Sequence, residues 1–235
     1  MPRPHIICHM CTSIDGKILG SRWFKLPGGK AGAMLFEPTA ASFGIGAWLV
    51  GTTTMKEFQG HPMKLAKPQS PVPGGDFVAN PKAKSHAIGV DARAVLRFQK
   101  SEVAGDHVVL LISQRASAAY RAHLRKAGAS YLICGKSKVD LPLALHKIRQ
   151  KLGLTKLMLQ GGGRFNGSML RAGLVDEISH IVVPIVDGGG PTIPGLFDAP
   201  GQPKPHAIAS LREISHKKLK GGVHWYRYRV GYGKA

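Results

Sequence analysis

Three consecutive glycines after a short apolar run are the part of this sequence best suited to chemistry. Leu157–Gln160 has the composition of a buried strand, Gly161–Gly163 follow at once, and a helical pattern begins beyond them. Glycine lets a backbone lie flat against a ligand, and a helix start offers unpaired N–H groups and a positive dipole end. We interpret this turn as a seat for a pyrophosphate, which predicts a nucleotide-binding enzyme. The alternative is a tight turn without a ligand, for which three glycines are more than is needed.

Two other apolar runs lead into turns that favour anions. Gly51–Thr54 follows one expected strand and Ser113–Arg115 follows another, and both offer hydroxyl groups at an expected helix start. Ser113 has the alternative role of a simple helix cap. Arg115 in a first helical turn opposes the helix dipole, and a bound anion would offset that conflict. Parallel strands end at one edge of a sheet, so we expect the three turns to converge on one cleft. A ligand with a pyrophosphate and one further phosphate, such as NADPH, fits this arrangement.

Asp15 is the candidate for proton delivery, which a hydride transfer also requires. It ends an apolar run in a chain with only 13 acidic residues, so burial would raise its pKa into a useful range. The equally open alternative is a turn aspartate that is bonded to the backbone before Gly16. Lys17 is a candidate for a substrate phosphate or else a solvated charge, and Trp23 either lines the cleft or packs in the core.

Other chemistries lack their motifs. The dinucleotide pattern Gly-x-Gly-x-x-Gly fails at Asn166, and a P-loop ending at Ser137 would need glycine where Ser130 stands. Cys8 and Cys11 are three residues apart on an expected strand, so their thiols point to opposite faces and we expect core cysteines. The zinc-deaminase and serine-hydrolase patterns do not occur.

Composition indicates a globular enzyme with a basic surface. The 235 residues include 33 basic and 13 acidic side chains, a net charge of +20, and three cysteines. The basic residues are scattered apart from His216–Lys220, which we interpret as a solvated turn, so nucleic-acid binding is the weaker interpretation of the charge. No apolar run is long enough for a membrane span, and the start resembles no signal peptide. Few cysteines suit a reducing compartment, so we expect a cytoplasmic protein.

The elements that must position these residues alternate between strand and helix and then end in two strands. This order predicts a single α/β domain over 1–235, with a mixed, mainly parallel central sheet flanked by helices and a C-terminal antiparallel hairpin. Gly28–Gly29 should be loop, Pro38 should begin a helix, Asp140 should cap one, and 60–85 should be a long loop or lid. We expect strands over 4–12, 47–51, 107–112, 130–134, 157–160, 177–186, 206–215 and 223–230, and helices over 31–43, 52–58, 141–152, after Ser113 and from Gly163 to about Arg171.

Several of these segments, in this order and spacing, resemble one known family. The resemblance is to the reductase domain of riboflavin biosynthesis, the RibD C-terminal family, which is related in fold to dihydrofolate reductase. It covers nearly the whole chain. The matching segments are Ser13–Lys17, Leu49–Thr54, Gly161–Gly163, Gly173–Glu177 and Pro184–Gly189.

The resemblance implies a dihydrofolate-reductase-like fold, NADPH as cofactor and a homodimer. It implies reduction of the ribose of 5-amino-6-(5-phosphoribosylamino)uracil, a phosphorylated small molecule, to the ribityl form. By similarity, Gly161, Gly162, Gly163 and Thr54 hold the pyrophosphate, and Ser113 and Arg115 meet the adenosine 2′-phosphate. Gly51 and Thr52 are further candidates for cofactor binding. Also by similarity, Arg164, Phe165 and Asn166 lie beside the cofactor. Ser13, Lys17, Trp23 and Gln160 are our candidates for substrate binding.

Two alternatives stay open. Family members often have glutamate where Gln160 stands, so a reductase of the same fold acting on another heterocycle or carbonyl is the first. Folate reduction is disfavoured, because Gly28, Gly29 and Lys30 stand where dihydrofolate reductases carry an acid. The second alternative is a basic nucleic-acid-binding protein with a vestigial nucleotide cleft.

Overall fold

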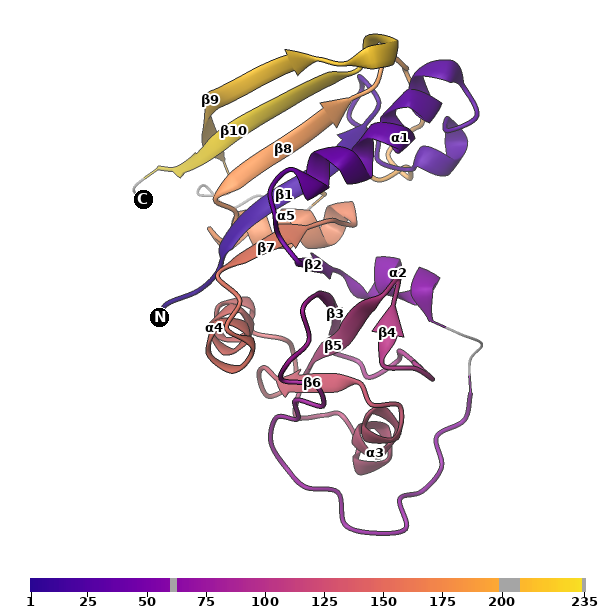
Figure 1. Ribbon diagram of the computed structural model, residues 1–235, viewed down its shortest axis with the longest axis vertical. Coiled ribbons are helices and arrows are strands. Elements are labelled where there is room, and N and C mark those ends of the chain that lie inside the picture. The colour runs from indigo at the N-terminus through magenta and orange to yellow at the C-terminus, as the bar shows by residue number, and fades with distance from the viewer. Residues whose placement is uncertain (60–62, 199–207, 234–235) are drawn as a thin grey trace. The chain divides into compact units, whose positions relative to one another are not determined.

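The computed structural model describes residues 1–59, 63–198 and 208–233 (Figure 1). The chain forms two compact units, and each is described by itself. Residues 46–157 and the first four residues make one unit, and residues 5–45 and 158–235 make the other. The middle of the sequence is thus a unit in its own right, and the other unit is assembled from both ends of the chain.

The first unit is built on a mainly parallel sheet. Strands β2, β3, β5 and β6 pair in parallel, with Ala47 opposite His86 and Val109 opposite Ser130, while the short β4 pairs with β5 in antiparallel fashion. Nearly every residue of β5 is buried, as expected for a parallel strand covered on both faces. The strands are β2 (Ala47–Val50), β3 (His86–Asp91), β4 (Glu102–Val103), β5 (Asp106–Ile112) and β6 (Ser130–Ile133).

Two capped helices of this unit pack against β6. Helix α4 (Leu141–Leu152) begins after Asp140, whose carboxylate accepts the Leu143 N–H at 2.9 Å, so the predicted cap is confirmed. Helix α3 (Ala118–Lys126) begins after Ser117, whose hydroxyl accepts the Tyr120 N–H at 3.1 Å. The expected helix start at Ser113 is therefore wrong, because Ser117 provides the cap. The short helices α2 (Thr52–Met55) and η2 (Lys56–Phe58) confirm the predicted turn of helix after β2.

The described part of the long loop is fastened to β6 near its end. Phe77 forms an antiparallel bridge with Tyr131, and the Asp76 carboxylate accepts the Ile133 N–H at 2.8 Å. The Lys147 ammonium donates to both oxygens of Asp76 at 2.9 Å. These bonds cover the open edge of β6, which a parallel strand at a sheet border would otherwise expose.

The second unit has a sheet that joins both ends of the chain. Strand β1 pairs in parallel with β8, with Cys8 opposite Ile178, and β8 continues into the antiparallel strands β10 and β9. The predicted C-terminal hairpin is confirmed, with a bulge at Arg227 and Tyr228. The strands are β1 (His5–Thr12), β8 (Glu177–Val182), β9 (Ala209–Lys218) and β10 (His224–Tyr232), and β7 (Lys156–Leu159) runs from the first unit into the second; the 3-10 helices are η1 (Gly20–Arg22) and η4 (Lys220–Gly222).

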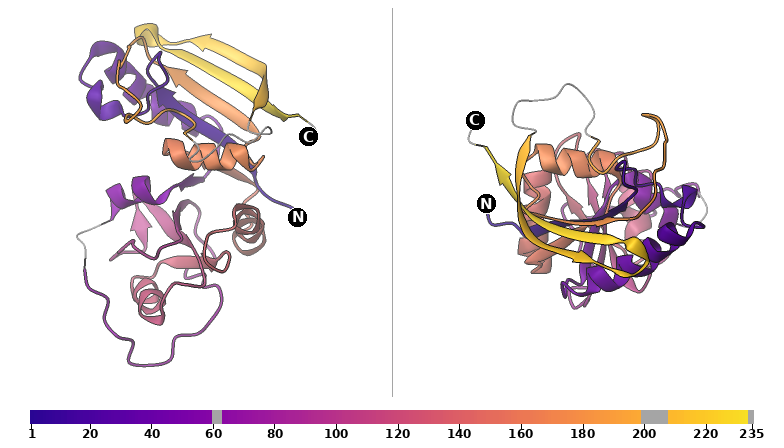
Figure 2. Two further views of the ribbon diagram at one scale, coloured as in Figure 1. Left: turned by 180° about the vertical axis from the view of Figure 1, so that it is seen from behind. Right: turned by 90° about the horizontal axis from the view of Figure 1, so that it is seen from above.

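Helix α1 (Pro27–Ala41) packs against β1 and β8, and α5 (Gly163–Arg171) lies on the other face of this unit's sheet (Figure 1, Figure 2). Two expectations about α1 are wrong. Gly28 and Gly29 are helical, because Pro27 has the backbone angle of a first helical residue and starts the helix before them. A Cβ on Gly29 would lie 2.1 Å from the Trp23 carbonyl oxygen, so glycine permits this close contact. Pro38 lies inside the helix, where it forgoes one backbone hydrogen bond.

The core of the second unit confirms the cysteine prediction. Cys8 and Cys11 are buried and free, and so is Cys134, which belongs to the first unit. Burial raises the pKa of the Cys11 thiol to about 12. Trp23 and Trp225 pack in one apolar cluster with Cys11. Taken as a class, the fold is the predicted α/β type, with mostly parallel strands, flanking helices and a C-terminal hairpin.

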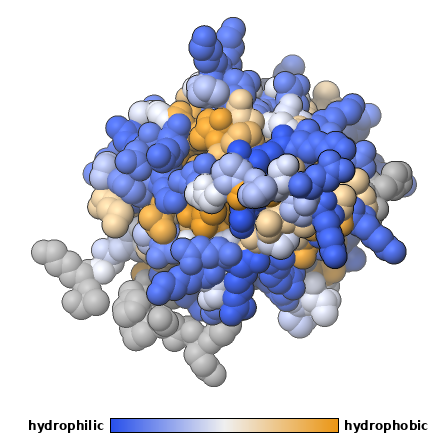
Figure 3. Space-filling model, turned by 90° about the horizontal axis from the view of Figure 1, so that it is seen from below, coloured by the Kyte–Doolittle hydropathy of each residue, from blue (hydrophilic) through white to orange (hydrophobic). Residues whose placement is uncertain are grey.

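The surface reflects the composition. On the face drawn in Figure 3, hydrophilic side chains surround smaller apolar patches, in keeping with 33 basic residues in the chain. Among the residues that the structure describes, no helix combines the length and apolar character that crossing a membrane requires.

Candidate active site

The predicted site residues fall into two groups, one in each unit. Gly51, Thr52, Thr54, Ser113 and Arg115 belong to the first unit. The glycine turn, the first turn of α5 and the loop after β1 belong to the second unit.

Two of the three predicted turns lie together within the first unit. Thr52 follows β2, Ser113 follows β5, and β3 runs between these strands. The Thr52 hydroxyl donates to the Val90 carbonyl at 2.6 Å, and the Ser113 hydroxyl donates to the Ala92 carbonyl at 2.9 Å. The segment that leaves β3 therefore joins both turns, as expected for neighbouring parallel strands that end at one edge.

These bonds change the roles that Thr52 and Ser113 can play. A hydroxyl has one proton to donate, and both protons already point to backbone carbonyls. A phosphate accepts hydrogen bonds, so neither hydroxyl can donate to it in this arrangement. Ser113 also accepts the Arg115 N–H at 3.3 Å. Both residues thus organise the turn, and the Thr54 hydroxyl and the Arg115 guanidinium are left as the side-chain donors of this group.

The expected conflict between Arg115 and a helix dipole does not arise. Arg115 precedes α3 by three residues and is exposed in the turn after β5. Its guanidinium makes no hydrogen bond or ion pair with any residue in 1–59, 63–198 or 208–233. Gly51 is buried and precedes the four-residue helix α2 without a side-chain cap.

Asp91 is a residue of this group that sequence reasoning missed. It ends β3 and is fully buried, and its carboxylate accepts the N–H groups of Val95 and Leu96 at 3.0 and 2.8 Å. The Tyr120 hydroxyl donates to it at 2.6 Å, and burial together with this carboxylate raises the pKa of Tyr120. The sequence carries a signal for it, because a polar residue follows the short run Ala87–Val90 directly, as Thr52 and Ser113 follow their strands closely.

Backbone conformation and packing explain two of the three glycines in the turn of the second unit. Gly161 has φ of +116°, a conformation that favours glycine. A Cβ on Gly163 would lie 2.1 Å from the Gly195 carbonyl oxygen, so the loop at Gly195 requires glycine there. Gly162, with φ of −65°, has a backbone conformation that any residue can adopt. The turn itself therefore accounts for Gly161 and Gly163, whereas backbone conformation does not account for Gly162.

The first turn of α5 is closed on one side by the loop at Gly195. Gly162 precedes the helix without a side-chain cap, and the Asp198 N–H donates to the Gly163 carbonyl at 2.9 Å. Asn166 is fully buried and its amide nitrogen donates to the Leu196 carbonyl at 3.1 Å. Within the described part of the chain, its Oδ1 has no hydrogen-bond partner. Arg164 is exposed and Phe165 is half-buried.

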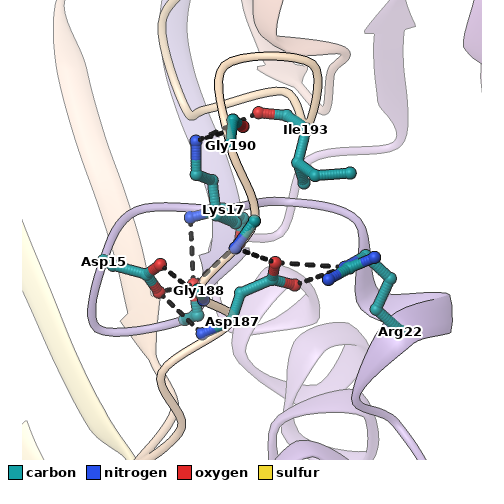
Figure 4. A network of polar contacts seen from close by, with 9 residues as sticks. Asp15, Lys17, Arg22, Asp187, Gly188, Gly190 and Ile193 are labelled. Carbon is teal, nitrogen blue, oxygen red and sulfur yellow. Dashed lines mark hydrogen bonds and ion pairs between the residues drawn. The ribbon is translucent and has the colours of Figure 1, made fainter.

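Asp15 lies in the loop after β1 and braces a second loop (Figure 4). Its carboxylate accepts the Ser13 hydroxyl at 2.7 Å and the N–H groups of Asp187 and Gly188 at 2.9 and 3.1 Å. The side chain is exposed, and these donors lower the pKa of Asp15 to about 2, the Ser13 hydroxyl first. The expectation that burial raises this pKa is wrong, because hydrogen bonds to the charged form dominate.

Lys17 and Arg22 fasten the same loop (Figure 4). The Lys17 ammonium donates to the carbonyls of Gly190 and Ile193 at 3.3 and 3.2 Å. Arg22 Nε lies 2.9 Å from the Asp187 carboxylate, whose side chain is 1% exposed. Ser13 and Lys17 therefore bind the protein itself in this structure.

The two remaining predicted substrate residues differ in accessibility. Trp23 is 2% exposed and packs in the core, which agrees with the packing interpretation rather than with a cleft wall. Its indole N–H has no partner within the described residues. Gln160 is half-buried and follows β7 directly.

Solved structures share this fold. A pyrimidine reductase-like protein from Corynebacterium diphtheriae matches with a TM-score of 0.65 at 18% identity, over 97% of this chain and 92% of that one. The riboflavin biosynthesis reductase of Saccharomyces cerevisiae matches with a TM-score of 0.58 at 14% identity, over 97% and 90%. At these identities the likeness defines the fold.

The chain belongs to the RibD C-terminal domain family, whose model matches residues 4–225. A relative from Aquifex aeolicus, named 2,5-diamino-6-ribosylamino-4(3H)-pyrimidinone 5′-phosphate reductase, is 26% identical over 223 residues, which is 92% of each protein. A protein of the same name from Methanothermobacter thermautotrophicus is 40% identical over 81 residues, 34% of this chain and 37% of that protein. These findings confirm the family inferred from the sequence.

Proposed function

We propose that this protein is an NADPH-dependent reductase of the riboflavin-biosynthesis type. Its substrate is a ribosylaminopyrimidine 5′-phosphate, either 5-amino-6-(5-phosphoribosylamino)uracil or the diaminopyrimidinone for which its relatives are named. The family match over residues 4–225 carries this proposal. Reduction turns the ribosyl group into a ribityl group, so one hydride and one proton are added to the sugar.

The residues present fit a nicotinamide dinucleotide. Helix α5 begins at a glycine with no side-chain cap, and its first N–H groups have no acceptor within the helix. The buried Oδ1 of Asn166 is an acceptor without a partner in the described chain. We assign Gly161, Gly162 and Gly163 to the pyrophosphate, and Arg164, Phe165 and Asn166 to the groups beside it.

The first unit supplies the proposed site for the 2′-phosphate. Arg115 would bind it directly, and Ser113 would hold the turn that carries this donor. Thr54, in the neighbouring turn that Gly51 and Thr52 help to form, is assigned to the pyrophosphate. A guanidinium suits a phosphate because it is always charged and offers several donors. When bound, NADPH supplies the hydride, and the protein supplies orientation and charge.

Asp15 serves this activity by holding a loop rather than by giving up a proton. A carboxyl with a pKa of about 2 is ionised at neutral pH and has no proton to give. Its bonds to Asp187 and Gly188 fix the start of the loop that Lys17 also holds. Ser13 and Lys17 thus shape the substrate region, while Gln160 is the residue we assign to direct substrate contact.

We further propose a cytoplasmic homodimer. The free, buried cysteines suit a reducing compartment, and the homodimer follows from the family resemblance. Sedimentation equilibrium of the purified protein measures the oligomeric state directly, and a monomer at micromolar concentration would contradict this part of the proposal.

The test is an assay of purified protein with NADPH and each of the two pyrimidines. We expect loss of NADPH absorbance and a product that has gained one hydride and one proton, identified by mass spectrometry. Faster turnover of the diaminopyrimidinone would assign the substrate named for the relatives, and faster turnover of the uracil would assign the other. Tight NADPH binding without reduction of either compound would point to another heterocycle, and retention of DNA without NADPH oxidation would favour the nucleic-acid alternative.

A further inference from the structure

A buried carboxylate stands behind the two hydroxyl-bearing turns of the first unit. Asp91 is fully buried, and within the described residues its carboxylate accepts from two backbone N–H groups and from the Tyr120 hydroxyl. Desolvating a carboxylate is costly unless such bonds replace water. The bonds to Val95 and Leu96 close the turn that follows β3, so the carboxylate fixes the course of that turn.

The backbone on either side of Asp91 receives the two hydroxyl groups. The carbonyl of Val90 accepts from Thr52 and the carbonyl of Ala92 accepts from Ser113. The Ser113 oxygen in turn accepts the N–H of Arg115. One chain of hydrogen bonds therefore runs from the buried carboxylate, through its own peptide units, to the residue that we assign to the 2′-phosphate.

We propose that Asp91 is a positioning residue for the phosphate end of NADPH. It holds the carbonyls of residues 90 and 92 so that Thr52 and Ser113 are oriented, and Ser113 then sets the backbone of Arg115. This inference rests on the proposed function. It assigns to Asp91 no contact with the cofactor and no part in the chemical step.

The role requires a carboxylate rather than an amide. In Asp91→Asn, one oxygen becomes an NH₂ group that meets a backbone N–H of Val95 or Leu96, so two donors face each other. A buried donor without an acceptor destabilises its surroundings. We expect the turn at 91–96 to shift and the hydroxyl bonds to residues 90 and 92 to loosen with it.

Asp76→Asn is the matched control in the same unit. Asp76 also accepts a backbone N–H and a side-chain donor, and it also fastens a loop to a strand, but its partners are Ile133 and Lys147. Loss of stability should therefore be similar in the two variants. Only Asp91→Asn should disturb Thr52, Ser113 and Arg115, which we assign to the cofactor site.

The experiment measures NADPH dissociation constants by fluorescence titration at a temperature where circular dichroism shows both variants folded. We expect Asp91→Asn to weaken NADPH binding by about tenfold or more, and Asp76→Asn to change it by less than about threefold, the size typical of a distant substitution. In steady-state assays the KM for NADPH should rise in Asp91→Asn while kcat at saturation stays near wild type. The inference would be overturned if Asp91→Asn bound NADPH as tightly as the wild type does, or if both variants lost the same amount of affinity.

Hydrogen exchange of the wild-type protein keeps the inference testable if Asp91→Asn does not fold. Addition of NADPH should slow exchange of the Val95 and Leu96 amides more than exchange of the Phe77 and Ala79 amides, which belong to the Asp76 loop. No difference between the two segments while NADPH is bound would overturn the positioning role alone. A wild-type protein that binds no NADPH would overturn the proposed function, and the inference with it.

Discussion

At the scale of single residues, the loop that begins at Asp187 depends on one carboxylate. Asp15 is exposed and accepts the N–H groups of Asp187 and Gly188. Its partners Asp187 and Gly188 lie more than 170 residues away in the chain, so no local pattern reveals them. The pKa of a carboxyl depends on such donors, so the local sequence around Asp15 does not predict it.

Replacement of Asp15 distinguishes a role in holding the loop from a role as proton donor. In Asp15→Asn, one oxygen becomes a donor that faces the N–H of Asp187 or Gly188, so we expect turnover to fall by about tenfold, the cost of an unmade bond to a charged group. NADPH affinity should be unchanged. Because the pKa of Asp15 is about 2, it stays ionised above that pH. The acid limb of the kcat profile between pH 5 and 8 should then keep its position in the variant, and a limb that disappears would identify Asp15 as the acid.

Gly162 permits a test that separates ligand binding from stability. Aspartate is favoured at a helix cap, so Gly162→Asp should leave the free energy of unfolding unchanged or raise it by a few tenths of a kcal/mol. The same carboxylate would repel a pyrophosphate, so NADPH binding should weaken by more than about tenfold. Calorimetry measures the affinity, and unchanged binding would remove the glycine turn from the cofactor site.

Gly163→Ala is the matched control for that experiment. Its Cβ would approach the Gly195 carbonyl oxygen at 2.1 Å, so we expect a loss of about 1–3 kcal/mol in the free energy of unfolding. If Gly163 acts mainly through the loop, Gly162→Asp should be the more stable variant in urea denaturation but should bind NADPH more weakly than Gly163→Ala does.

At the scale of elements, regular patterns were predicted well and close contacts were not. The cap at Asp140, strand β5 and the C-terminal hairpin follow from local sequence, because caps and apolar periodicity act over a few residues. Local sequence does not indicate strand β3, because His86 and Gly89 interrupt its apolar run, although β2 and β5 pair on both of its sides. The predicted start of α1 at residue 31 is too late, because Pro27 starts the helix and the glycines after it pack closely against Pro184 and Trp23.

The turn between β5 and α3 carries a prediction on cofactor selectivity. Arg115 is exposed, and its guanidinium is free among the described residues, so Arg115→Ala should not lower stability measurably. We expect it to weaken NADPH binding by about tenfold, the strength of one hydrogen-bonded charge pair, while NADH binding stays within about twofold. Parallel titrations with the two cofactors measure this ratio, and equal losses would remove Arg115 from the 2′-phosphate site.

At the scale of the whole molecule, a match to the family model over residues 4–225 spans both compact units. We therefore propose that residues 1–235 act as one reductase domain. Thermal unfolding followed by calorimetry should show one transition whose calorimetric and van't Hoff enthalpies agree. Two resolved transitions would show that the units unfold independently, and addition of NADPH should then stabilise both if each contributes to its binding.

Stability of the molecule should also depend on pH through two histidines of the paired strands β1 and β8. Burial lowers the pKa of His9 and of His180 to about 4, from an ordinary 6.5. Between pH 4 and pH 6.5 these histidines bind protons in the unfolded chain but not in the folded chain. Their contribution to the free energy of unfolding is therefore fully present above pH 6.5 and is lost as pH falls towards 4. We expect a loss on the order of 1–3 kcal/mol for His9, which is fully buried.

Urea denaturation from pH 7 to pH 4 measures this loss, and His9→Gln should reduce its slope. The control is His146→Gln, because the imidazole of His146 lies near the surface and bonds to the Pro2 carbonyl. A slope that is the same in wild type and His9→Gln would show that His9 does not carry the effect.

The division of the chain between its units has a consequence for synthesis on the ribosome. Residues 46–157 are contiguous, so that unit is complete before residues 158–235 are translated. Strand β1 emerges first but pairs with β8, so Cys8 must wait for Ile178 to leave the exit tunnel. We expect the middle of the chain to fold first on the nascent polypeptide, while the apolar strand β1 stays without its partner and in need of a chaperone.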